Sequence, residues 1–342
     1  MSYDLYVGRP QGDAVTQLRL LVTNPDQALR QYTRLAHGTY NRQTQQRTPP
    51  ALNTFIADQL QRLRALNINP PPLPDLSALP PSAWFLQFTF TLAKPWLSKD
   101  DEPFYVAESV NPVRKDKVFK VPVMAASSWK GLLRWTAMHT RLVLRKDALS
   151  PEEFAHERYA QALLFGDEKG EEPGQTKDFA AYLDRLKPEA RALYERSLRH
   201  HFQIAPDQPL PHFSGRLVFY PTFFDQIDVE VINPHSRKTR AGTHPIYLEC
   251  VPAGATGTFS LLYVPFDLVT TPDKARRQAA TDLVLVAESI RDMMLTYGFS
   301  AKRSSGFGLA QDQIEGEVHT QAGKKPLTRL SQLVQEVKGV AF

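Results

Sequence analysis

The sequence predicts an α+β fold. From residue 84 onward, short segments of alternating apolar and polar residues are interrupted by two long amphipathic helical patterns. With the insertions removed, the order is strand, helix, strand, strand, helix, strand, which is the order of ferredoxin-like and RRM-like domains. A domain of this kind presents a sheet face on which nucleic-acid bases can stack.

The composition indicates a globular protein of one or two domains. The chain has 342 residues, 42% of them apolar and 23% charged, which is enough for a sizeable core. The single cysteine, Cys250, forms no intrachain disulfide and fits a reducing cytosol, and its strand-like surroundings favour a buried structural role. There is no apolar run of transmembrane length, and the first residues lack a signal-peptide layout. We therefore expect a cytoplasmic protein without membrane contact.

Residues 1–82 are predicted to form a mainly helical N-terminal extension. Asn24-Pro25-Asp26-Gln27 is typical of a helix start, and Phe55–Leu63 has helical spacing. The prolines of residues 69–81 cannot continue a helix and form a semi-rigid spacer. We therefore expect an RNA-binding domain over residues 83–322 and a C-terminal helical tail over residues 323–342.

The first half of the predicted domain contains one strand and three helical regions. Residues 84–92 alternate apolar and polar side chains and predict a strand, followed by a long loop to about residue 126. Ser127 and Ser128 are N-cap candidates for a helix over residues 129–146. Further helices are predicted over residues 151–165 and 179–200.

The second half of the domain supplies the remaining strands. Residues 215–220 predict a strand, and residues 246–251 and 256–264 predict a β-hairpin across Pro252–Ala255. An amphipathic helix follows over residues 274–297. A last strand is predicted over residues 313–319 and a short helix over residues 327–338.

Positive charge is concentrated in one segment. Between Glu108 and Lys146 there are nine cations and two acids, in a chain of net charge +5. On the predicted helix, Lys130, Arg134, Arg141 and Arg145 fall within an arc of about 60°. This stripe is either a solvated face or a surface for a polyanionic partner, and the absence of an acid between Lys130 and Lys146 favours the second interpretation.

A glycine-rich basic loop follows the second long helix, at Tyr297–Leu309. Its three glycines let the backbone approach a ligand closely, and its cations, serines and phenylalanines suit a nucleic-acid backbone. The spacing is not that of a P-loop. The alternative is a glycine helix cap followed by a solvated basic turn.

Two other groups of residues allow a structural and a functional interpretation. His235 and His244 lack the further ligands that a metal site needs, so we expect no metal, but His235 could act as a general base on a 2′-hydroxyl while Lys238 or Arg240 stabilises the phosphorane. The aromatic side chains around Pro221 either stack bases or pack in the core, the commoner role. They are Phe219, Tyr220, Phe223 and Phe224.

Three motifs resemble those of the RAMP superfamily, the repeat-associated subunits of type III CRISPR effector complexes. VPVMAASSWKGLLR at Val121–Arg134 is similar to the family's IPGSSLKGxLR segment, and Leu164-Phe165-Gly166 resembles its LFG. Ser300–Leu309 resembles the glycine-rich GxGAKxxxGYG loop. Asp228–His235 is a weaker match to the DVxxPH segment of the Cmr-type branch, and residues 1–82 have no counterpart.

The resemblance implies that the chain holds a guide RNA, beside its complementary target RNA and other type III effector subunits, without a cofactor. In relatives the first helix and the glycine-rich loop lie against the guide backbone, and a loop after the first strand forms a thumb, here Asp100–Val121. Carried onto this sequence, the RNA-binding candidates are Ser127, Ser128, Lys130, Arg134, Lys302, Arg303, Ser304, Ser305 and Gly306. Arg141, Arg237, Lys238 and Arg240 are added as further cations, and Arg114, Lys115 and Lys117 belong to the thumb loop.

Some relatives cut target RNA with an aspartate of the thumb loop. This chain has Val110 at the corresponding place, so we expect a non-catalytic subunit. The alternative is an endoribonuclease that cuts target RNA through Asp101 or Glu108, or guide precursor through His235. Asp116 corresponds to a residue without the cutting role.

Overall fold

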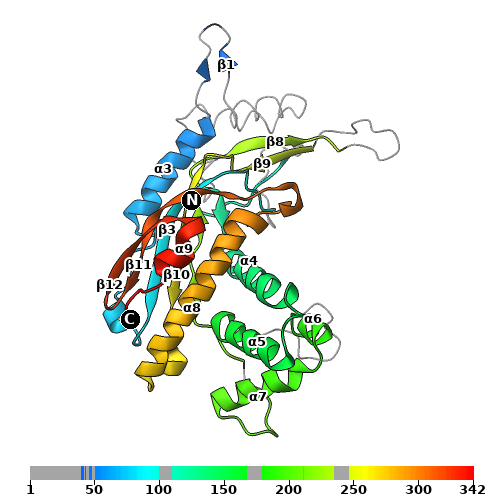
Figure 1. The fold of residues 1–342 in the computed structure, drawn as a ribbon. Helices are drawn as coiled ribbons and strands as arrows, with labels where there is room; N and C mark the ends of the chain where they lie inside the picture. Colours follow the sequence, from blue (N-terminus) through cyan, green and yellow to red (C-terminus); the bar gives the residue numbers. More distant parts are fainter. Residues whose placement is uncertain are drawn as a thin grey trace.

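The computed structural model describes residues 40, 41, 43, 46, 47, 51–99, 110–167, 179–210, 212–234 and 246–342. At its centre is an antiparallel sheet with the strand order β12-β11-β3-β10-β6 (Figure 1). These strands are β3 (Trp84–Leu92), β6 (Leu217–Phe219), β10 (Thr256–Tyr263), β11 (Ala310–Thr320) and β12 (Gly323–Arg329).

The predicted order of strands and helices is confirmed. β3, β6, β10 and β11 are its first, second, third and fourth strands, and they lie side by side in the order fourth, first, third, second. α4 (Ala126–Met138) and α8 (Pro272–Asp292) are its two helices, and each runs into a π-helical turn, at His139–Val143 and Met293–Tyr297. This arrangement is that of a ferredoxin-like domain.

The apolar face of the sheet forms the main core. Side chains alternate along a strand, so every second residue of β3 points to the same side. Trp84, Leu86, Phe88, Phe90 and Leu92 are buried there. They belong to one cluster with the buried side chains of α4 and α8, which therefore cover this face.

The opposite face of the sheet is polar at its centre. It carries Gln87 and Thr89 of β3, opposite Ser260 and Thr258 of β10. Gln87 Nε2 donates to the carbonyl oxygen of Pro71 at 3.0 Å, so the proline-rich segment runs against this face. The β3 aromatic residue on the same side, Phe85, is buried against Tyr220, with ring centroids 5.9 Å apart.

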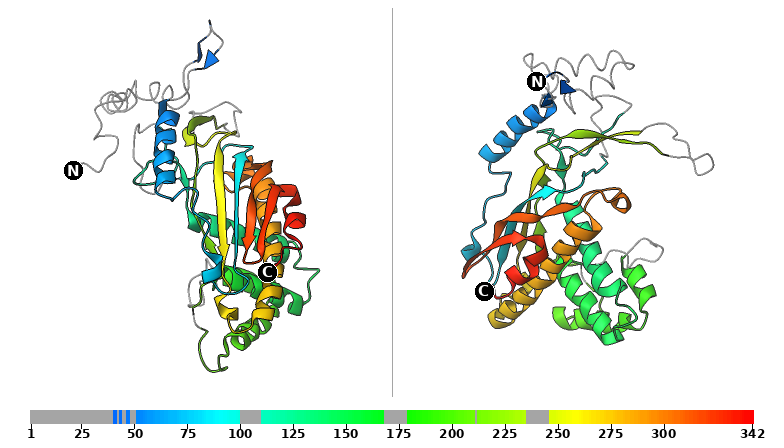
Figure 2. Two further views of the ribbon diagram at one scale, coloured as in Figure 1. Left: turned by 90° about the vertical axis from the view of Figure 1, so that its left-hand side faces the viewer. Right: turned by 45° about the horizontal axis from the view of Figure 1, so that its top comes forward.

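A group of helices with its own core is inserted between α4 and β6. It consists of α5 (Pro151–Phe165), α6 (Phe179–Leu186) and α7 (Ala190–Phe202). The α5 helix begins with a capping box, because Ser150 and Glu153 each accept the other's backbone N–H. In the views of Figure 2 these helices, in green, lie at the end of the molecule opposite α3. Their apolar cluster is separate from that of the sheet and contains Met138, Leu142, Leu149, Phe154, Ala155, Ala162, Leu183, Ala190, Tyr194 and Leu198.

A buried charged network joins this helical group to the sheet. Arg216, just before β6, donates through Nη1 to Asp282 Oδ2 of α8 at 2.9 Å and through Nε to Asp267 Oδ1 at 2.9 Å. His201 Nε2 of α7 lies 3.0 Å from Asp267 Oδ2. Asp267 is in the 3₁₀ turn Phe266–Leu268 that follows β10.

The predicted hairpin of residues 246–251 and 256–264 is wrong in its pairing. Both segments are extended, as β9 (Ile246–Cys250) and β10, but β9 pairs with β8 (Asp228–Ile232) and with β4 (Val110–Asn111). β10 instead pairs with β3 and β6. The turn at Pro252–Ala255 therefore links two sheets, because longer-range pairing outweighs the local turn signal. A further small sheet pairs β5 (Val123–Met124) with β7 (Thr222–Phe223).

The N-terminal region contributes a short hairpin and one helix. β1 (Tyr40–Asn41) pairs with β2 (Gln46–Arg47), and α3 (Ala51–Ala65) confirms the predicted helical spacing. Apart from Gln43, the rest of residues 1–50, including the predicted helix start at Asn24, lies outside the described residues. Leu52, Ile56, Leu60 and Leu63 of α3 belong to the main core cluster. The division of the chain at residue 82 stays a prediction.

The C-terminal tail differs from its prediction in one respect. Residues 323–329 form the edge strand β12, not the first turn of a helix. The 3₁₀ turn Leu330–Gln332 and α9 (Leu333–Val337) follow, and their buried side chains join the main core. A turn at Thr320–Gly323 returns the chain beside β11, where the apolar pattern alone indicated a helix.

Candidate nucleic-acid interface

The two loops singled out in the sequence meet at one end of the sheet. The segment after β3 and the glycine-rich loop before β11 are joined by backbone hydrogen bonds. Ala93 N–H donates to the carbonyl oxygen of Leu309 at 2.8 Å, and Gly308 N–H donates to that of Pro95 at 2.7 Å. The first turn of α4 reaches the same place, because the ring of Trp129 lies 5.1 Å from that of Phe299.

The base of the glycine-rich loop is clamped by buried side chains. Trp96 Nε1 donates to the carbonyl oxygen of Phe299 at 2.9 Å. Ser300 Oγ accepts the N–H of Leu97 at 2.8 Å and donates to its carbonyl oxygen at 2.9 Å. These bonds satisfy backbone groups that would otherwise be buried without partners, so the two ends of the loop are held in a defined position.

The tip of the loop is a tight turn that presents polar groups to solvent. Arg303–Ser305 form a 3₁₀ turn between Lys302 and Gly306, which both have left-handed backbones with φ of 58° and 79°. The side chains of Lys302, Ser304 and Ser305 are exposed. A cation and two hydroxyls therefore share one exposed turn, as phosphate recognition requires.

Arg303 differs from its neighbours in the tip because its guanidinium lies on α4. Its Cζ atom is 4.3 Å from the centre of the Trp135 ring. Trp135 in turn stacks on His139, with centroids 4.8 Å apart and ring planes 8° apart, and Tyr297 meets both rings edge-on. Trp135 was not among the residues predicted from the sequence, although its spacing of four residues from His139 places both on one helix face.

The helix start at α4 differs from the prediction in detail. Its N-cap is Ala125, so Ser127 and Ser128 lie inside the first turn and do not cap the helix. Ser127 is exposed and Ser128 half-buried. Ser128 N–H donates to the carbonyl oxygen of Ala125 at 3.0 Å. The N–H groups of Ala126 and Ser127 belong to the part of a first turn that lacks partners within the helix, so they retain the chemistry expected of an anion site.

Two of the predicted basic side chains on α4 have different environments. Lys130 is half-buried near the helix start. Arg134 donates to the carbonyl oxygens of Asp167 at 3.2 Å and Gly166 at 3.4 Å, where α5 ends. A cation at a helix C-terminus is stabilised by the helix dipole, so Arg134 has a structural contact within the chain.

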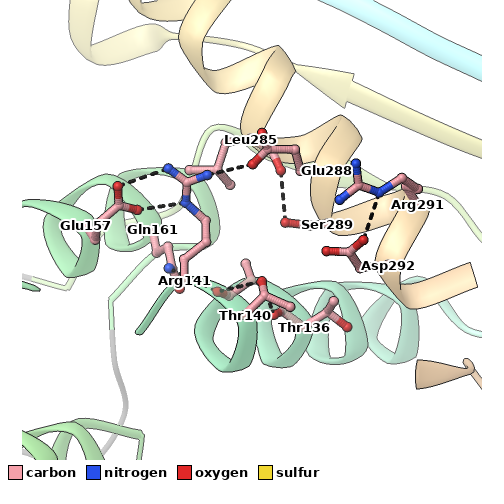
Figure 3. Close-up of polar contacts among 11 residues, drawn as sticks. Thr136, Thr140, Arg141, Glu157, Gln161, Leu285, Glu288, Ser289, Arg291 and Asp292 are labelled. Atoms are coloured by element: carbon pink, nitrogen blue, oxygen red, sulfur yellow. Dashed lines mark hydrogen bonds and ion pairs between the residues drawn. The ribbon is translucent and has the colours of Figure 1, made fainter. Parts of the chain in front are cut away.

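Arg141 corrects the predicted basic stripe. Its guanidinium pairs with Glu157 of α5 through Nε at 2.7 Å and Nη2 at 2.9 Å, and with Glu288 of α8 through Nη1 at 2.6 Å (Figure 3). The hydrogen bond to Glu157 raises the pKa of Arg141, against the effect of its burial. The acids missing from α4 itself are thus supplied by neighbouring helices, which the linear sequence did not indicate.

The described part of the predicted thumb loop is a compact turn packed on the core. Asp116 Oδ1 accepts the N–H of Val118 at 2.9 Å and that of Phe119 at 2.8 Å, which gives this carboxylate a role in the turn. Lys115 forms an ion pair with Glu249, a side chain that is almost fully buried. Lys117 is exposed at the turn.

The buried carboxyl of Glu249 lies under this turn. Burial raises the pKa of Glu249 to about 8, against the opposing effect of the Val113 N–H, which donates to Glu249 Oε2 at 3.0 Å. The contact with Lys115 favours its ionised form. Arg114, half-buried, donates its backbone N–H to the carbonyl oxygen of Ser98 at 2.9 Å.

Several candidate residues lie outside the described parts of the chain. They are Asp101, Glu108, His235, Arg237, Lys238 and Arg240. Within the described ranges, no group of three or more His, Cys, Asp or Glu side chains is placed to hold a metal ion. Nor do those ranges contain a helix with the length and apolar character needed to cross a bilayer.

The aromatic residues around Pro221 have the structural role that their composition favoured. Phe223 and Phe224 are buried, and Phe224 packs against Trp96 with ring centroids 4.8 Å apart. Phe219 stacks on Phe165 at 6.5 Å. Phe224 thus packs in the core near the loop end of the sheet, whereas Phe219 lies further along it, opposite Leu261 of β10.

A family model described as the RAMP superfamily matches residues 103–311. Among solved structures, the type III-B Cmr-beta complex bound to cognate target RNA is similar at 13% identity, covering 78% of this chain and 66% of that chain, with a TM-score of 0.37. The Csm3-Csm4 subcomplex of the type III-A interference complex has 12% identity, coverage of 78% and 99%, and a TM-score of 0.37. Csc2 of Thermofilum pendens has 12% identity, coverage of 79% and 77%, and a TM-score of 0.36. No curated protein matches the chain.

Proposed function

Because the chain belongs to the RAMP superfamily, we propose that it is a guide-RNA-binding subunit of a type III CRISPR effector complex of the Cmr-like kind. One observation carries this proposal. The glycine-rich loop and α4, which are far apart in the sequence, are joined at one end of the sheet. Phe299 contacts Trp129 near the start of the helix, and Arg303 contacts Trp135 nearly two turns further along it. A single strand of RNA can touch both.

The proposed contacts are made mainly to the sugar–phosphate backbone. Lys302 supplies a charge, Ser304 and Ser305 supply hydroxyls, and the start of α4 supplies backbone N–H groups beside Ser127. Such contacts hold any sequence in the same register, as a subunit that receives different guides requires. Lys117 of the thumb loop, which is exposed, and Lys130 of α4, which is half-buried, are further candidates for such contacts.

A stacking mode on the open sheet face is less favoured. The centre of that face carries Gln87, Thr89 and Thr258, which offer no aromatic surface to a base, and Pro71 lies against it. The aromatic side chains of β3 that would suit stacking, Phe88 and Phe90, are buried on the opposite side. These observations argue against an RRM-like binder that acts alone through its sheet.

We propose a non-catalytic role for this subunit. Among the thumb residues that the structure describes, Asp116 caps its own turn through two backbone hydrogen bonds. Cleavage of target RNA through Asp101 or Glu108, or of guide precursor through His235, is the alternative. In the assembled complex the chain is expected to contact the target RNA that pairs with the guide, to pack against other effector subunits, and to reside in the cytoplasm.

Copurification of the assembled complex tests the proposal. The tagged chain, coexpressed with the effector subunits and CRISPR array of its own source, is expected to retain a guide RNA of defined length. The same complex, given labelled target RNA, is then compared with Asp101→Ala, Glu108→Ala and His235→Ala variants. Recovery of a free monomer without RNA contradicts guide binding, and loss of cleavage in one of the variants contradicts the non-catalytic role.

A further inference from the structure

The tip of the glycine-rich loop is connected to the rest of the molecule by an aromatic side chain. Residues 299, 300, 308 and 309 at its base are held by hydrogen bonds to residues 93–97. Within the tip, the Arg303 side chain contacts α4, where its guanidinium lies over Trp135.

Trp135 is itself held in place by its neighbours. His139, one turn further along the chain, stacks on the indole, and Tyr297 meets the indole at 5.5 Å with ring planes 78° apart. The Arg303 guanidinium lies over the same indole, with its Cζ atom 4.3 Å from the ring centroid. The indole therefore has contacts with His139, Tyr297 and Arg303 that define its orientation before any ligand arrives.

From this geometry we infer that Trp135 is a positioning residue for the phosphate-binding loop. The inference rests on the proposed RNA-binding function and adds to it a residue that touches no phosphate. The contact with Trp135 holds the Arg303 guanidinium against α4, and the turn Arg303–Ser305 then keeps Lys302, Ser304 and Ser305 on the exposed side. A loop held in its binding conformation loses less conformational entropy when the RNA binds, so affinity increases without an added contact.

Limited proteolysis of the full chain, in the absence of RNA, tests whether the Arg303–Trp135 contact holds the loop tip on α4. Trypsin cleaves after Lys302 and Arg303, and cleavage requires the tip to leave α4. Trp135→Leu is expected to speed cleavage at these two bonds by about fivefold, the ratio that corresponds to about 1 kcal/mol for the cation–π interaction that the substitution removes. Trp135→Phe, which keeps a ring face, is expected to restore most of the protection. The exposed aromatic Tyr182 of α6 supplies the control variant Tyr182→Leu.

RNA binding by the same variants tests the positioning role. Dissociation constants for single-stranded RNA are measured across a salt series. Trp135→Leu and Arg303→Lys are expected to weaken binding several-fold at every salt concentration while the salt slope is unchanged, because neither removes a cation. Lys302→Ala is expected to reduce the slope, since it does remove one.

The outcomes separate the two proposals. An unchanged rate of proteolysis in Trp135→Leu would show that Trp135 does not hold the loop tip on α4. Faster proteolysis with unchanged RNA affinity would show that this contact does not position the loop for RNA. Neither result contradicts RNA binding itself. A parental chain that binds RNA without salt dependence, or not at all, overturns the proposed function and with it the role of Trp135 in RNA binding. Circular dichroism of each variant confirms that the loss is not one of folding.

Discussion

Gly308 packs against Ser300 so closely that a Cβ atom at position 308 would lie 2.3 Å from the Ser300 Cβ. Gly308 has φ of 72°, which side chains disfavour, and Ser300 is the residue whose hydroxyl bonds both backbone groups of Leu97. The contact therefore closes the base of the glycine-rich loop where that base joins the segment after β3. This closure requires glycine for two independent reasons, conformation and space.

Two of the three glycines of the loop, Gly306 and Gly308, are expected to differ in their tolerance of a side chain. Gly308→Ala should lower the free energy of unfolding by about 2–4 kcal/mol, because the methyl group collides with Ser300 and the backbone is strained. Gly306 has φ of 79° but open space around it, so Gly306→Ala should cost only about 1–2 kcal/mol. Chemical denaturation of the two variants measures the difference, and equal losses would contradict the packing described for Gly308.

Removal of the two cations at the loop tip is expected to weaken RNA binding to a similar extent for all RNA sequences. In Lys302→Ala/Arg303→Ala, the slope of log affinity against log salt should shrink by roughly 0.7 for each phosphate of single-stranded RNA that the protein no longer neutralises. Lys324→Ala, at an exposed cation of the edge strand β12, is the matched control and should leave the slope unchanged. A loss confined to particular RNA sequences would indicate base recognition instead of phosphate recognition.

Arg141 is expected to matter for stability and not for RNA. Arg141→Met leaves Glu157 and Glu288 facing each other without their shared cation, and should lower the free energy of unfolding by about 1–3 kcal/mol. Its RNA salt slope should equal that of the parental chain. If Arg141→Met instead reduces the salt slope of RNA binding and leaves stability unchanged, Arg141 contacts RNA, as the basic stripe predicted from the sequence implied.

The network around Asp267 is expected to make stability depend on acid pH. Burial by itself raises the pKa of Asp267, but hydrogen bonds from His201 and Arg216 outweigh it and hold the pKa below its ordinary value of 3.8. A carboxyl whose pKa is lower in the folded than in the unfolded state stabilises the protein when the pH is above the unfolded-state pKa. This contribution to the free energy of unfolding is lost as the pH falls through and below about 4. Asp267→Asn should therefore be clearly less stable than the parental chain at pH 7 and closer to it at pH 3.

Denaturation curves at several pH values check this expectation. Asp273→Asn is a suitable control, since Asp273 forms an exposed ion pair with Arg276 one turn away on α8. Such surface pairs contribute little to stability. If the difference in free energy of unfolding between Asp267→Asn and the parental chain stays constant from pH 7 to pH 3, the ionised Asp267 carboxylate is not the source of the acid sensitivity.

Much of the fold was predictable because its signals are local. The alternation at Trp84–Leu92 and the apolar spacing of α8 identified elements whose bounds the structure nearly reproduces. Predictions failed where partners are distant in sequence. The pairing of β9 with β8 instead of β10 is one case. The strand at Gly323–Arg329 is a different case, because its partner β11 is adjacent in the chain and the short turn after Thr320 was not recognised in the sequence.

The candidate site shows the same division. The sequence by itself determined which residues are candidates for contact with a phosphate backbone, because glycine spacing, adjacent cations and a helix start are properties of short segments. Only the tertiary structure decided which of them act together. Trp135 lies against Arg303, and Glu157 of α5 and Glu288 of α8 pair with Arg141. Such contacts depend on how segments that are distant in the chain pack on one sheet, so the sequence alone did not show them.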